Sequence, residues 1–384
     1  MTEGQFKETV GGEGNSPLYH RIVVKVGTNV LTAGTDRLDL EVMASLVGQM
    51  ARLHEAGMET IVVSSGAVAA GRHRLGLAKD RRGIPFRQVL AAVGQSRLMD
   101  AYDQLFGWHG IIVAQTLLTK ADLSDRGGYL NARNTLLALM ELGVIPIVNE
   151  NDVVAVDELK GAKFGDNDNL SAMVANLVDA DLLILFTDTQ GLHTADPHRD
   201  PTARLISRVE HIDGETERLA KGRYRGVGGM ATKIQAARLA TASGVAVIIA
   251  YGRERDVLTR LVAGESLGTF FSPTTSKLES RKRWLLSGLS SRGSLVVDEG
   301  ASRAVRELNR SLLAAGVKSI EGDFQRGDVV AIVDDGGRSI ACGIVNYSAT
   351  DIDAIKGYPS QRIQALLGYQ YGAEVVHRNN LVVL

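Results

Sequence analysis

The sequence predicts an α/β protein: a three-layer α/β/α sandwich around a mostly parallel sheet, followed by a small β-rich domain. Three observations support this prediction. Apolar, β-branched runs alternate with amphipathic helical patterns up to about residue 271, as strands and helices do around a parallel sheet. The chain has 42 glycines but only 7 prolines, which favours many tight turns between strands and helices. Its 384 residues are enough for roughly two domains with separate cores.

The strands and helices of the larger domain follow one another from Arg21. Short apolar runs predict buried strands at Arg21–Val26, 60–63, 111–114, 144–148, 182–186 and 245–250. Apolar residues at helical spacing predict helices at 40–53, 86–106, 130–142, 170–178 and from about 228 to 243. Gly57 is expected to end the first of these helices, a common position for glycine. We expect this domain to occupy residues 21–271.

The pattern changes after residue 271. Residues 272–284 are polar and contain one basic cluster, 281–283, which indicates a linker. Predicted short strands at 294–297, Val329–Val333 and 340–345, with a helix at 301–313, indicate a β-rich domain over 285–384. Residues 1–20 lack the apolar segment of a secretory signal, and we expect a disordered extension there.

Composition argues against several classes of protein. There are 43 Lys and Arg against 44 Asp and Glu, so the whole chain does not resemble an electrostatic nucleic-acid or membrane-surface binder. No run of about eighteen apolar residues occurs, and we expect no membrane span. The single cysteine, Cys342, excludes an internal disulfide and favours a reducing, cytoplasmic location. Its apolar neighbours predict a buried structural residue.

Polar or glycine-rich segments follow the predicted strands or open the predicted helices. These segments are 25–28, 65–67, 149–152, 165–169, 187–188 and 226–233. Each one alone also fits ordinary turn or helix-cap chemistry. Ligands of parallel α/β sheets bind at the carboxyl ends of the strands, so we expect the segments to meet at one edge of the sheet.

Two lysines, several glycines and a few carboxylates at one edge suit phosphoryl transfer, which needs positioning and charge neutralisation more than covalent chemistry. Lys25 and Lys233 would flank the moving phosphoryl group, and glycine N–H groups would hold its oxygens. A metal ion would bridge the nucleotide phosphates, and Asn and Asp side chains would hold a small acceptor. The sequence contains no Walker A motif, and no dinucleotide-binding glycine fingerprint follows the first strand.

The motifs at these segments resemble the amino acid kinase superfamily. They are Val-Lys25-Val-Gly27-Thr, Ser65-Gly66-Ala67, Asn149-Glu-Asn-Asp152, Gly165-Asp-Asn167-Asp168-Asn, Thr187-Asp188 and Gly228-Gly229-Met230-Ala-Thr-Lys233. Within the superfamily, the stretches 90–98 (LAAVGQSRL) and 191–197 (GLHTADP) look like the glutamate 5-kinase family. The region after the linker is similar to a PUA domain. The resemblance covers about residues 21–384.

The resemblance implies the amino acid kinase fold and a reaction. ATP, with Mg²⁺, phosphorylates the side-chain carboxylate of L-glutamate to give L-glutamyl 5-phosphate, the first step of proline biosynthesis. It also implies feedback inhibition by L-proline and a homo-oligomer, a dimer or tetramer, formed through the kinase domain.

Roles for single residues are implied by the same motifs. Lys25 and Lys233 would stabilise the transferring phosphoryl group, and Asp168 would orient the two lysines. Ser65, Asp152 and Asn167 would hold glutamate. Asp152 would pair with the substrate ammonium and so reject N-acylated analogues. The implied ATP contacts are Lys25, Gly27, Thr187, Asp188, Val227, Gly228, Gly229, Met230, Ala231, Thr232 and Lys233. The resemblance implies no metal site made of protein ligands alone.

Three alternatives stay open. Acetylglutamate kinase, aspartokinase, UMP kinase and carbamate kinase share the lysine and glycine pattern, but the loops at 149–152 and 165–169 and the C-terminal domain favour a glutamate 5-kinase. PUA domains also occur in RNA-modifying enzymes, yet residues 290–384 carry 10 Lys and Arg against 11 Asp and Glu. We therefore expect no RNA binding and a structural or regulatory domain. A catalytically inactive scaffold would lack Lys25, Asp168 or Lys233, and all three are present.

Overall fold

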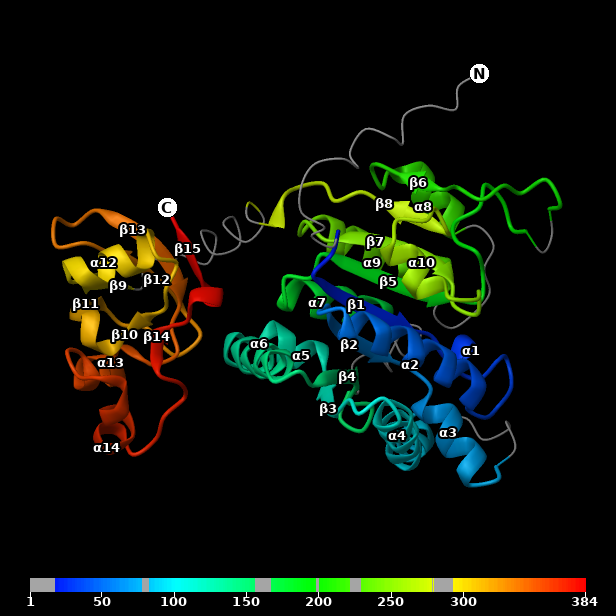
Figure 1. The fold of residues 1–384 in the computed structure, drawn as a ribbon, viewed down its shortest axis with the longest axis horizontal. Helices are drawn as coiled ribbons and strands as arrows, with labels where there is room; N and C mark the ends of the chain where they lie inside the picture. The colour runs from blue at the N-terminus through cyan, green and yellow to red at the C-terminus, as the bar shows by residue number, and fades with distance from the viewer. Residues whose placement is uncertain are drawn as a thin grey trace, which may run out of the picture.

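The computed structural model describes residues 18–77, 83–155, 167–197, 200–221, 229–277, 279 and 293–384. Figure 1 shows a large sheet with helices on both faces and a smaller β-rich unit that contains the C-terminus. Both parts of the predicted fold class are confirmed. Residues 1–17 of the expected extension, the basic cluster 281–283 and residues 278, 280 and 284 of the expected linker lie outside the described residues.

The large unit is built on an eight-stranded sheet in the order β3-β4-β2-β1-β5-β7-β8-β6. The six strands from β3 to β7 in this order pair in parallel, whereas β8 is antiparallel to β7. A parallel sheet covered on both faces requires continuous apolar runs, and every residue of β5 is buried. The strands are β1 (Arg21–Val26), β2 (Glu59–Ser64), β3 (Val113–Leu118), β4 (Ile145–Glu150), β5 (Leu182–Thr187), β6 (Arg208–Val209), β7 (Ala246–Tyr251) and β8 (Thr269–Phe271).

Helices cover both faces of this sheet and complete the three layers (Figure 1). Buried residues of α2, α4 and α10 form one core with the sheet, and those of α6, α7 and α9 form the other. The helices are α1 (Thr28–Leu31), α2 (Leu40–Glu55), α3 (Ala67–Arg74), α4 (Ile84–Gly107), α5 (Lys120–Ser124), α6 (Arg126–Glu141), α7 (Asn167–Leu177), α8 (Gly214–Lys221), α9 (Met230–Thr241) and α10 (Val257–Val262).

The central strand β1 serves both cores. Ile22 and Val24 belong to the core under α2, whereas Val23 belongs to the core under α7 and α9. Successive strand residues point to opposite faces, so Lys25 lies on the face of Val23. The chain leaves β1 toward β2 but leaves β5 toward β7, so the direction of winding reverses between β1 and β5. A reversal of this kind marks the ligand crevice of an open α/β sheet.

The C-terminal unit has a five-stranded sheet in the order β11-β9-β12-β13-β15 and a two-stranded sheet, β10-β14. Cys342 lies in β13 and is fully buried, as predicted. The elements are β9 (Gly293–Val297), α12 (Glu299–Arg306), β10 (Leu312–Leu313), η2 (Ala314–Gly316), β11 (Val317–Gly322), β12 (Val329–Val333), β13 (Ser339–Ile344), α13 (Ala349–Ile355), η3 (Ser360–Arg362), α14 (Ile363–Leu367), β14 (Glu374–Val376), η4 (Arg378–Asn380) and β15 (Leu381–Val383).

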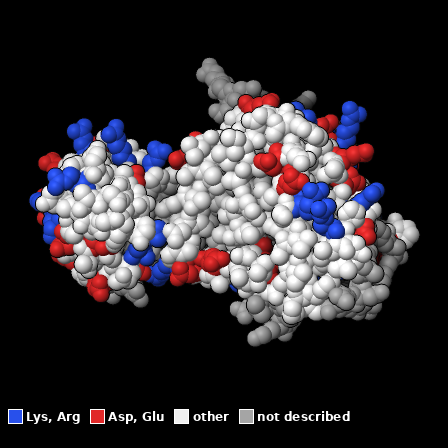
Figure 2. All heavy atoms as spheres, turned by 90° about the horizontal axis from the view of Figure 1, so that it is seen from below, with Lys and Arg blue, Asp and Glu red and all other residues white. Residues whose placement is uncertain are grey.

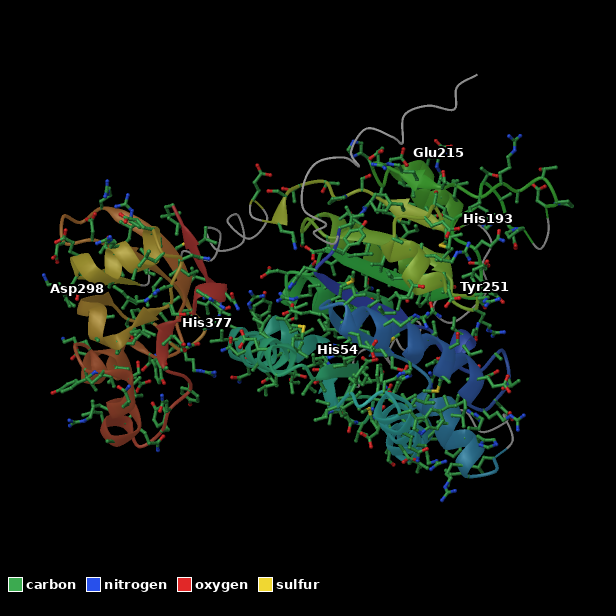
Figure 3. All side chains as sticks on the ribbon, in the orientation of Figure 1. His54, His193, Glu215, Tyr251, Asp298 and His377 are labelled. Carbon is green, nitrogen blue, oxygen red and sulfur yellow. The ribbon has the colours of Figure 1, made fainter. Side chains whose placement is uncertain are left out.

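Helix α6 forms the junction between the two units. Leu130 packs into an apolar cluster with residues of β12, β13 and β15. Arg126 pairs with Asp328 at 2.5 Å, and Arg326 donates a hydrogen bond of 2.6 Å to Asn131 Oδ1. In Figure 3, His377 lies on the side of the C-terminal unit that faces α6.

Two predicted elements differ from the structure in extent. The helix predicted over 301–313 ends at Arg306, and 312–313 form β10 instead. Asn309 adopts a left-handed conformation with φ of 48°, which a helix cannot continue through. The strand predicted at 111–114 is wrong in its bounds, because β3 extends to Leu118 through the polar residues Gln115 and Thr116. An edge strand is partly solvated and therefore lacks a continuous apolar run.

The surface carries both signs of charge. Figure 2 shows Lys and Arg interspersed with Asp and Glu over the face in view, in keeping with the formal net charge of −1. Across the ranges that the structure describes, none of the helices combines the length and the apolar character needed to cross a membrane.

Candidate active site

A pocket opens at the carboxyl ends of the central parallel strands. The segments after β1, β2, β4 and β5 border it, together with the start of α7 and one side chain of α9. It contains about 810 Å³ of space that no atom fills, open solvent at its mouth included. The predicted site residues that line it are Lys25, Gly27, Ser65, Asp152, Asn167, Thr187, Asp188 and Lys233.

Asp168 lies between the two predicted lysines. Lys25 Nζ is 2.5 Å from Asp168 Oδ1, and Lys233 Nζ is 3.2 Å from Asp168 Oδ2. The side chains come from β1, α7 and α9, and the three residues are only 5%, 1% and 4% exposed in that order. Thr232 Oγ1 donates a hydrogen bond of 2.7 Å to Asp168 Oδ2. One buried carboxylate therefore holds both ammonium groups at the pocket.

The charges of this cluster depend on one another. Burial raises the pKa of Asp168, but Lys25 and Lys233 outweigh it and hold that pKa well below its usual range. Burial lowers the pKa of Lys233, and the charge of Asp168 opposes that shift. With all three groups charged, two positive charges face one negative charge. The surplus positive charge of this buried cluster attracts an anion such as a phosphate.

The start of α9 adds backbone N–H groups. Gly229 precedes the helix in an extended conformation, and within the described part of the chain no side chain caps this helix start. The first N–H groups of a helix lack intrahelical partners, which makes them an anion site. Met230 and Ala231 belong to this first turn, whereas Val227 and Gly228 lie outside the described residues.

Asn167 connects the start of α7 to two strands. Its Nδ2 lies within hydrogen-bond distance of Ser64 O at 3.0 Å, Ser65 Oγ at 2.9 Å and Asn149 Oδ1 at 3.0 Å. Asn149 donates in turn to Gln95 Oε1 of α4 at 2.8 Å. The buried Oδ1 of Asn167 accepts no hydrogen bond within the ranges the structure describes. This oxygen is therefore available to a donor on a ligand.

A charged pair borders the other side of the pocket. Asp152 follows β4, and Arg87 reaches the pocket from the first turn of α4. Burial lowers the pKa of Arg87, the charge of Asp152 raises it, and Arg72 lowers it. Glu150 also lines the pocket. Carboxylates on this side of the pocket can bind the cationic end of a zwitterion, and the guanidinium can bind its anionic end.

The segment after β5 is held to the segment after β1. Asn29 Nδ2 donates to Asp188 Oδ2 at 2.7 Å, and Thr187 Oγ1 donates to Asp188 Oδ1 at 3.1 Å. Burial raises the pKa of Asp188, but the hydrogen bond from Asn29 and the other donors outweigh it and lower that pKa. Asp188 is therefore suited to line the site as a carboxylate and is not suited to donate a proton.

Two glycines stand at this edge. A Cβ on Gly27 would lie 3.3 Å from Phe186 O, a tight contact, and 3.5 Å from Lys25 Nζ, an ordinary one. Gly66 has a φ of +102° directly before α3, a conformation that L side chains rarely adopt. Both substitutions would disturb the floor of the pocket.

Comparison with known proteins agrees with this geometry. The model of the amino acid kinase family matches residues 20–251, and that of the PUA domain matches residues 293–367. A glutamate 5-kinase from Dehalococcoides mccartyi (strain CBDB1) is 58% identical over 372 residues, which cover 96% of this chain and 100% of that protein. The chain belongs to the glutamate 5-kinase family.

Other members of the family are similar over the same length. The glutamate 5-kinase of Herpetosiphon aurantiacus is 54% identical over 367 residues, which cover 95% of this chain and 98% of that protein. That of Shewanella woodyi is 50% identical over 368 residues, with the same two coverages. The resemblance to this family and to a PUA domain, stated from the motifs, is confirmed.

Sequence reasoning from the glutamate 5-kinase motifs located most of the pocket but not all of it. It missed Arg87 on α4 and Asn29 on α1, and it gave Asn149 and Glu150 no role. Arg87 had no local signal, because it stands in a helix about sixty residues before Asp152 in the chain. Asn149 and Glu150 stood in a quoted motif, and the strand-end position was the signal that would have included them.

Proposed function

We propose that this chain transfers the γ-phosphoryl group of ATP to the side-chain carboxylate of L-glutamate, giving L-glutamyl 5-phosphate and ADP. The observation that carries the proposal is the buried cluster of Lys25, Asp168 and Lys233 at the pocket of a glutamate 5-kinase family member. The fold alone would support several small-molecule kinases.

The reaction needs charge stabilisation more than proton transfer. One carboxylate oxygen of glutamate attacks the γ-phosphorus, the bond from that phosphorus to the oxygen bridging to ADP breaks, and its electron pair leaves with ADP. The carboxylate is already ionised at neutral pH, so no base has to remove a proton. Lys25 and Lys233 neutralise the charge on the transferring group, and Asp168 fixes both ammonium groups by its two oxygens.

The acceptor is held by polar groups across the pocket. Asp152 pairs with the α-ammonium of glutamate, and an N-acylated analogue lacks this charge. Asn167 accepts a hydrogen bond from glutamate with its free Oδ1, while its Nδ2 donates to Ser65 Oγ at 2.9 Å. This arrangement leaves the side-chain carboxylate to approach the two lysines.

The nucleotide lies between the segment after β5 and the start of α9. Thr187 and Asp188 contact ATP, and the N–H groups of Gly229, Met230 and Ala231 bind its phosphates. The N–H of Thr232 donates to Gly229 O at 3.1 Å instead. Across the described ranges, no three His, Cys, Asp or Glu side chains converge as a metal site. The described residues thus offer no cage of protein ligands alone, and we propose that Mg²⁺ enters with ATP on the phosphate oxygens.

The test measures ADP release with ATP and Mg²⁺, in parallel with L-glutamate, N-acetyl-L-glutamate, L-aspartate and UMP. We expect release with L-glutamate and suppression by L-proline, the feedback inhibitor implied by the family. Release with N-acetyl-L-glutamate at a similar rate would contradict the role of Asp152. ADP release with UMP alone would show that UMP, and not glutamate, is the acceptor.

A further inference from the structure

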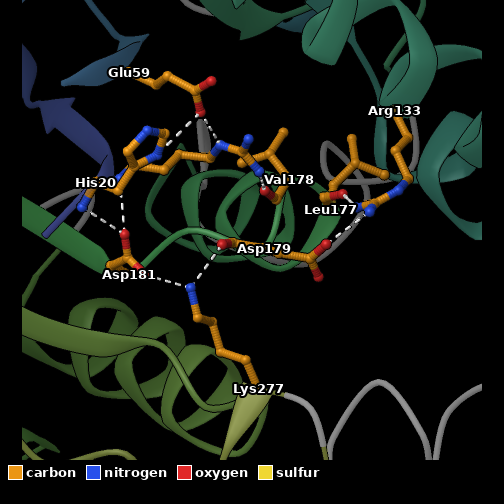
Figure 4. Close-up of polar contacts among 9 residues, drawn as sticks. His20, Glu59, Arg133, Leu177, Val178, Asp179, Asp181 and Lys277 are labelled. Carbon is orange, nitrogen blue, oxygen red and sulfur yellow. Dashed lines mark hydrogen bonds and ion pairs between the residues drawn. The ribbon is translucent and has the colours of Figure 1, made fainter. Parts of the chain in front are cut away.

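Helix α7 is anchored at both of its ends. Its first turn carries Asn167 and Asp168, and its carboxyl end presents three successive carbonyls to cations (Figure 4). The carbonyl oxygens and their donors are Leu177 with Arg133, Val178 with Arg21, and Asp179 with Lys277. We call these three cations the α7 clamp. The last carbonyls of a helix lack intrahelical partners, and cations stabilise them through the helix dipole.

The clamp gathers distant parts of the chain. Arg21 opens β1, Arg133 stands on α6 and Lys277 follows β8. Arg21 has a further effect, because it ties β1 to the carboxyl end of α7 while Lys25 ties the other end of β1 to Asp168. The strand and the helix are therefore joined at both ends, which sets how Asp168 meets Lys25.

Arg133 is the member of the clamp that also reaches the C-terminal unit. Its side chain is 4% exposed. Nε donates to Asn380 Oδ1 at 2.8 Å, and Nη2 lies 2.6 Å from both Asn379 O and Asp179 Oδ2. Nη1 donates to the carbonyl of Leu177. The planar guanidinium holds these partners in one fixed geometry, which a lysine cannot reproduce.

Helix α7 can transmit this anchoring to the pocket. It has 11 residues, a length of about 16 Å at 1.5 Å per residue. Its buried positions pack into the core shared by α6 and α9 along the whole helix. A packed helix of three turns moves as one body, so a shift at Leu177 changes the position of Asp168 relative to Lys25 and Lys233.

We propose that Arg133 is a positioning residue for phosphoryl transfer. Through α7 it holds Asp168 against the two lysines, and its bonds to 379–380 make the C-terminal unit part of that alignment. The kinetic test of this inference rests on the proposed function. The experiment therefore also measures amide hydrogen exchange in α7, which does not depend on the reaction.

The experiment compares Arg133→Gln with the matched control Arg126→Gln. Both changes remove an arginine of α6 that bonds to the C-terminal unit, but Arg126 pairs with Asp328 and makes no bond to α7 among the described contacts. We expect Arg133→Gln to lower kcat roughly 10- to 100-fold, the scale of a displaced catalytic group, with smaller changes in both KM values. Arg126→Gln should leave kcat unchanged.

A second variant separates positioning from folding. Asn380→Ala keeps the guanidinium of Arg133 and removes its Nε acceptor. It should lower kcat in the same direction, and the double variant should fall no further than Arg133→Gln, because Arg133→Gln already removes the contact that Asn380→Ala removes. If Arg133→Gln folds poorly, the kcat and the amide exchange of Asn380→Ala alone test the inference.

Amide hydrogen exchange over residues 167–172 provides a readout that does not need the reaction. Exchange should become faster in Arg133→Gln and in Asn380→Ala, and it should not change in Arg126→Gln. Wild-type kcat and wild-type protection in both of the first two variants would overturn the inference. A wild-type enzyme that phosphorylates no glutamate would refute the proposed function, while the exchange result would still test the anchoring of α7.

Discussion

Replacing Lys233 with methionine removes one positive charge from the pocket and keeps an unbranched side chain that is one atom shorter. Lys233 is buried, and its Nζ lies 3.2 Å from Asp168 Oδ2. Asp168 keeps Lys25 at 2.5 Å and Thr232 at 2.7 Å after the change. The carboxylate is therefore still paired, and two positive charges against one become one against one.

The expected magnitudes follow from this arrangement. Loss of one group that stabilises transition-state charge lowers kcat about 10²- to 10³-fold, or roughly 2.7–4 kcal/mol. The free energy of unfolding should change far less than the roughly 3–5 kcal/mol seen when a buried ion loses its partner. Burial lowers the pKa of Lys233, so its charge already destabilises the folded state, and methionine removes that cost.

The assay couples ADP release to a spectrophotometric signal, with thermal unfolding measured on the same preparations. Lys318→Met is the matched control, because Lys318 pairs with Asp335 on the surface of the C-terminal unit. A kcat for Lys233→Met within a few-fold of the control would refute the role given to Lys233. Loss of folding in Lys233→Met alone would refute the charge argument for stability.

Four further predictions concern the acceptor, the pH dependence of activity, the pH dependence of stability and the packing of α3. Asp152→Asn should raise the KM for glutamate about tenfold or more with a smaller change in kcat, checked by initial rates at saturating ATP. An unchanged KM would contradict the contact between Asp152 and the α-ammonium of glutamate. Because the pKa of Lys233 is lowered, activity should fall with rising pH below the usual lysine range, and Lys233→Arg should move that limb upward in a pH–kcat profile. The depressed pKa of Asp168 stabilises the fold above the unfolded carboxyl pKa, and this stability is lost as pH falls toward the folded value; Asp168→Asn should abolish that part of the acid transition in denaturant titrations. In Gly71→Ala the new Cβ would lie 1.9 Å from the carbonyl oxygen of Leu90, so α3 and α4 must separate; we expect a loss of several kcal/mol in unfolding free energy, and wild-type stability would contradict it.

The sequence was sufficient for the parallel core because that core is encoded locally. Each central strand contains a short apolar run, and each strand leads into a glycine or a polar residue at the pocket edge. Lys25 and Lys233 could be placed at one edge in advance, because Lys25 stands near the end of a strand and Lys233 in a glycine-rich segment that opens a helix. Asp168 could be assigned to them only through the family resemblance, since nothing in its spacing specifies a partner 65 residues away.

Short elements and long-range contacts could not be predicted from the sequence. The antiparallel strand β8 has three residues, too few for a periodic pattern. Helix α3 has little amphipathic pattern because it packs by close backbone contact, with Gly71 against Leu90 and Gly94 against Ala67. Arg133 reads as an ordinary helix residue in sequence, and only the fold brings it to α7 and the C-terminal unit at once.

The central claim is that a side-chain carboxylate oxygen of L-glutamate attacks the γ-phosphorus of ATP at the Lys25–Asp168–Lys233 cluster. The most direct measurement uses L-glutamate labelled with ¹⁸O in that carboxylate and follows the product by ³¹P NMR. The account predicts an acyl phosphate whose carbon–oxygen–phosphorus bridge contains ¹⁸O. Phosphate transferred without ¹⁸O at the phosphorus, or no phosphorylated glutamate at all, would contradict it.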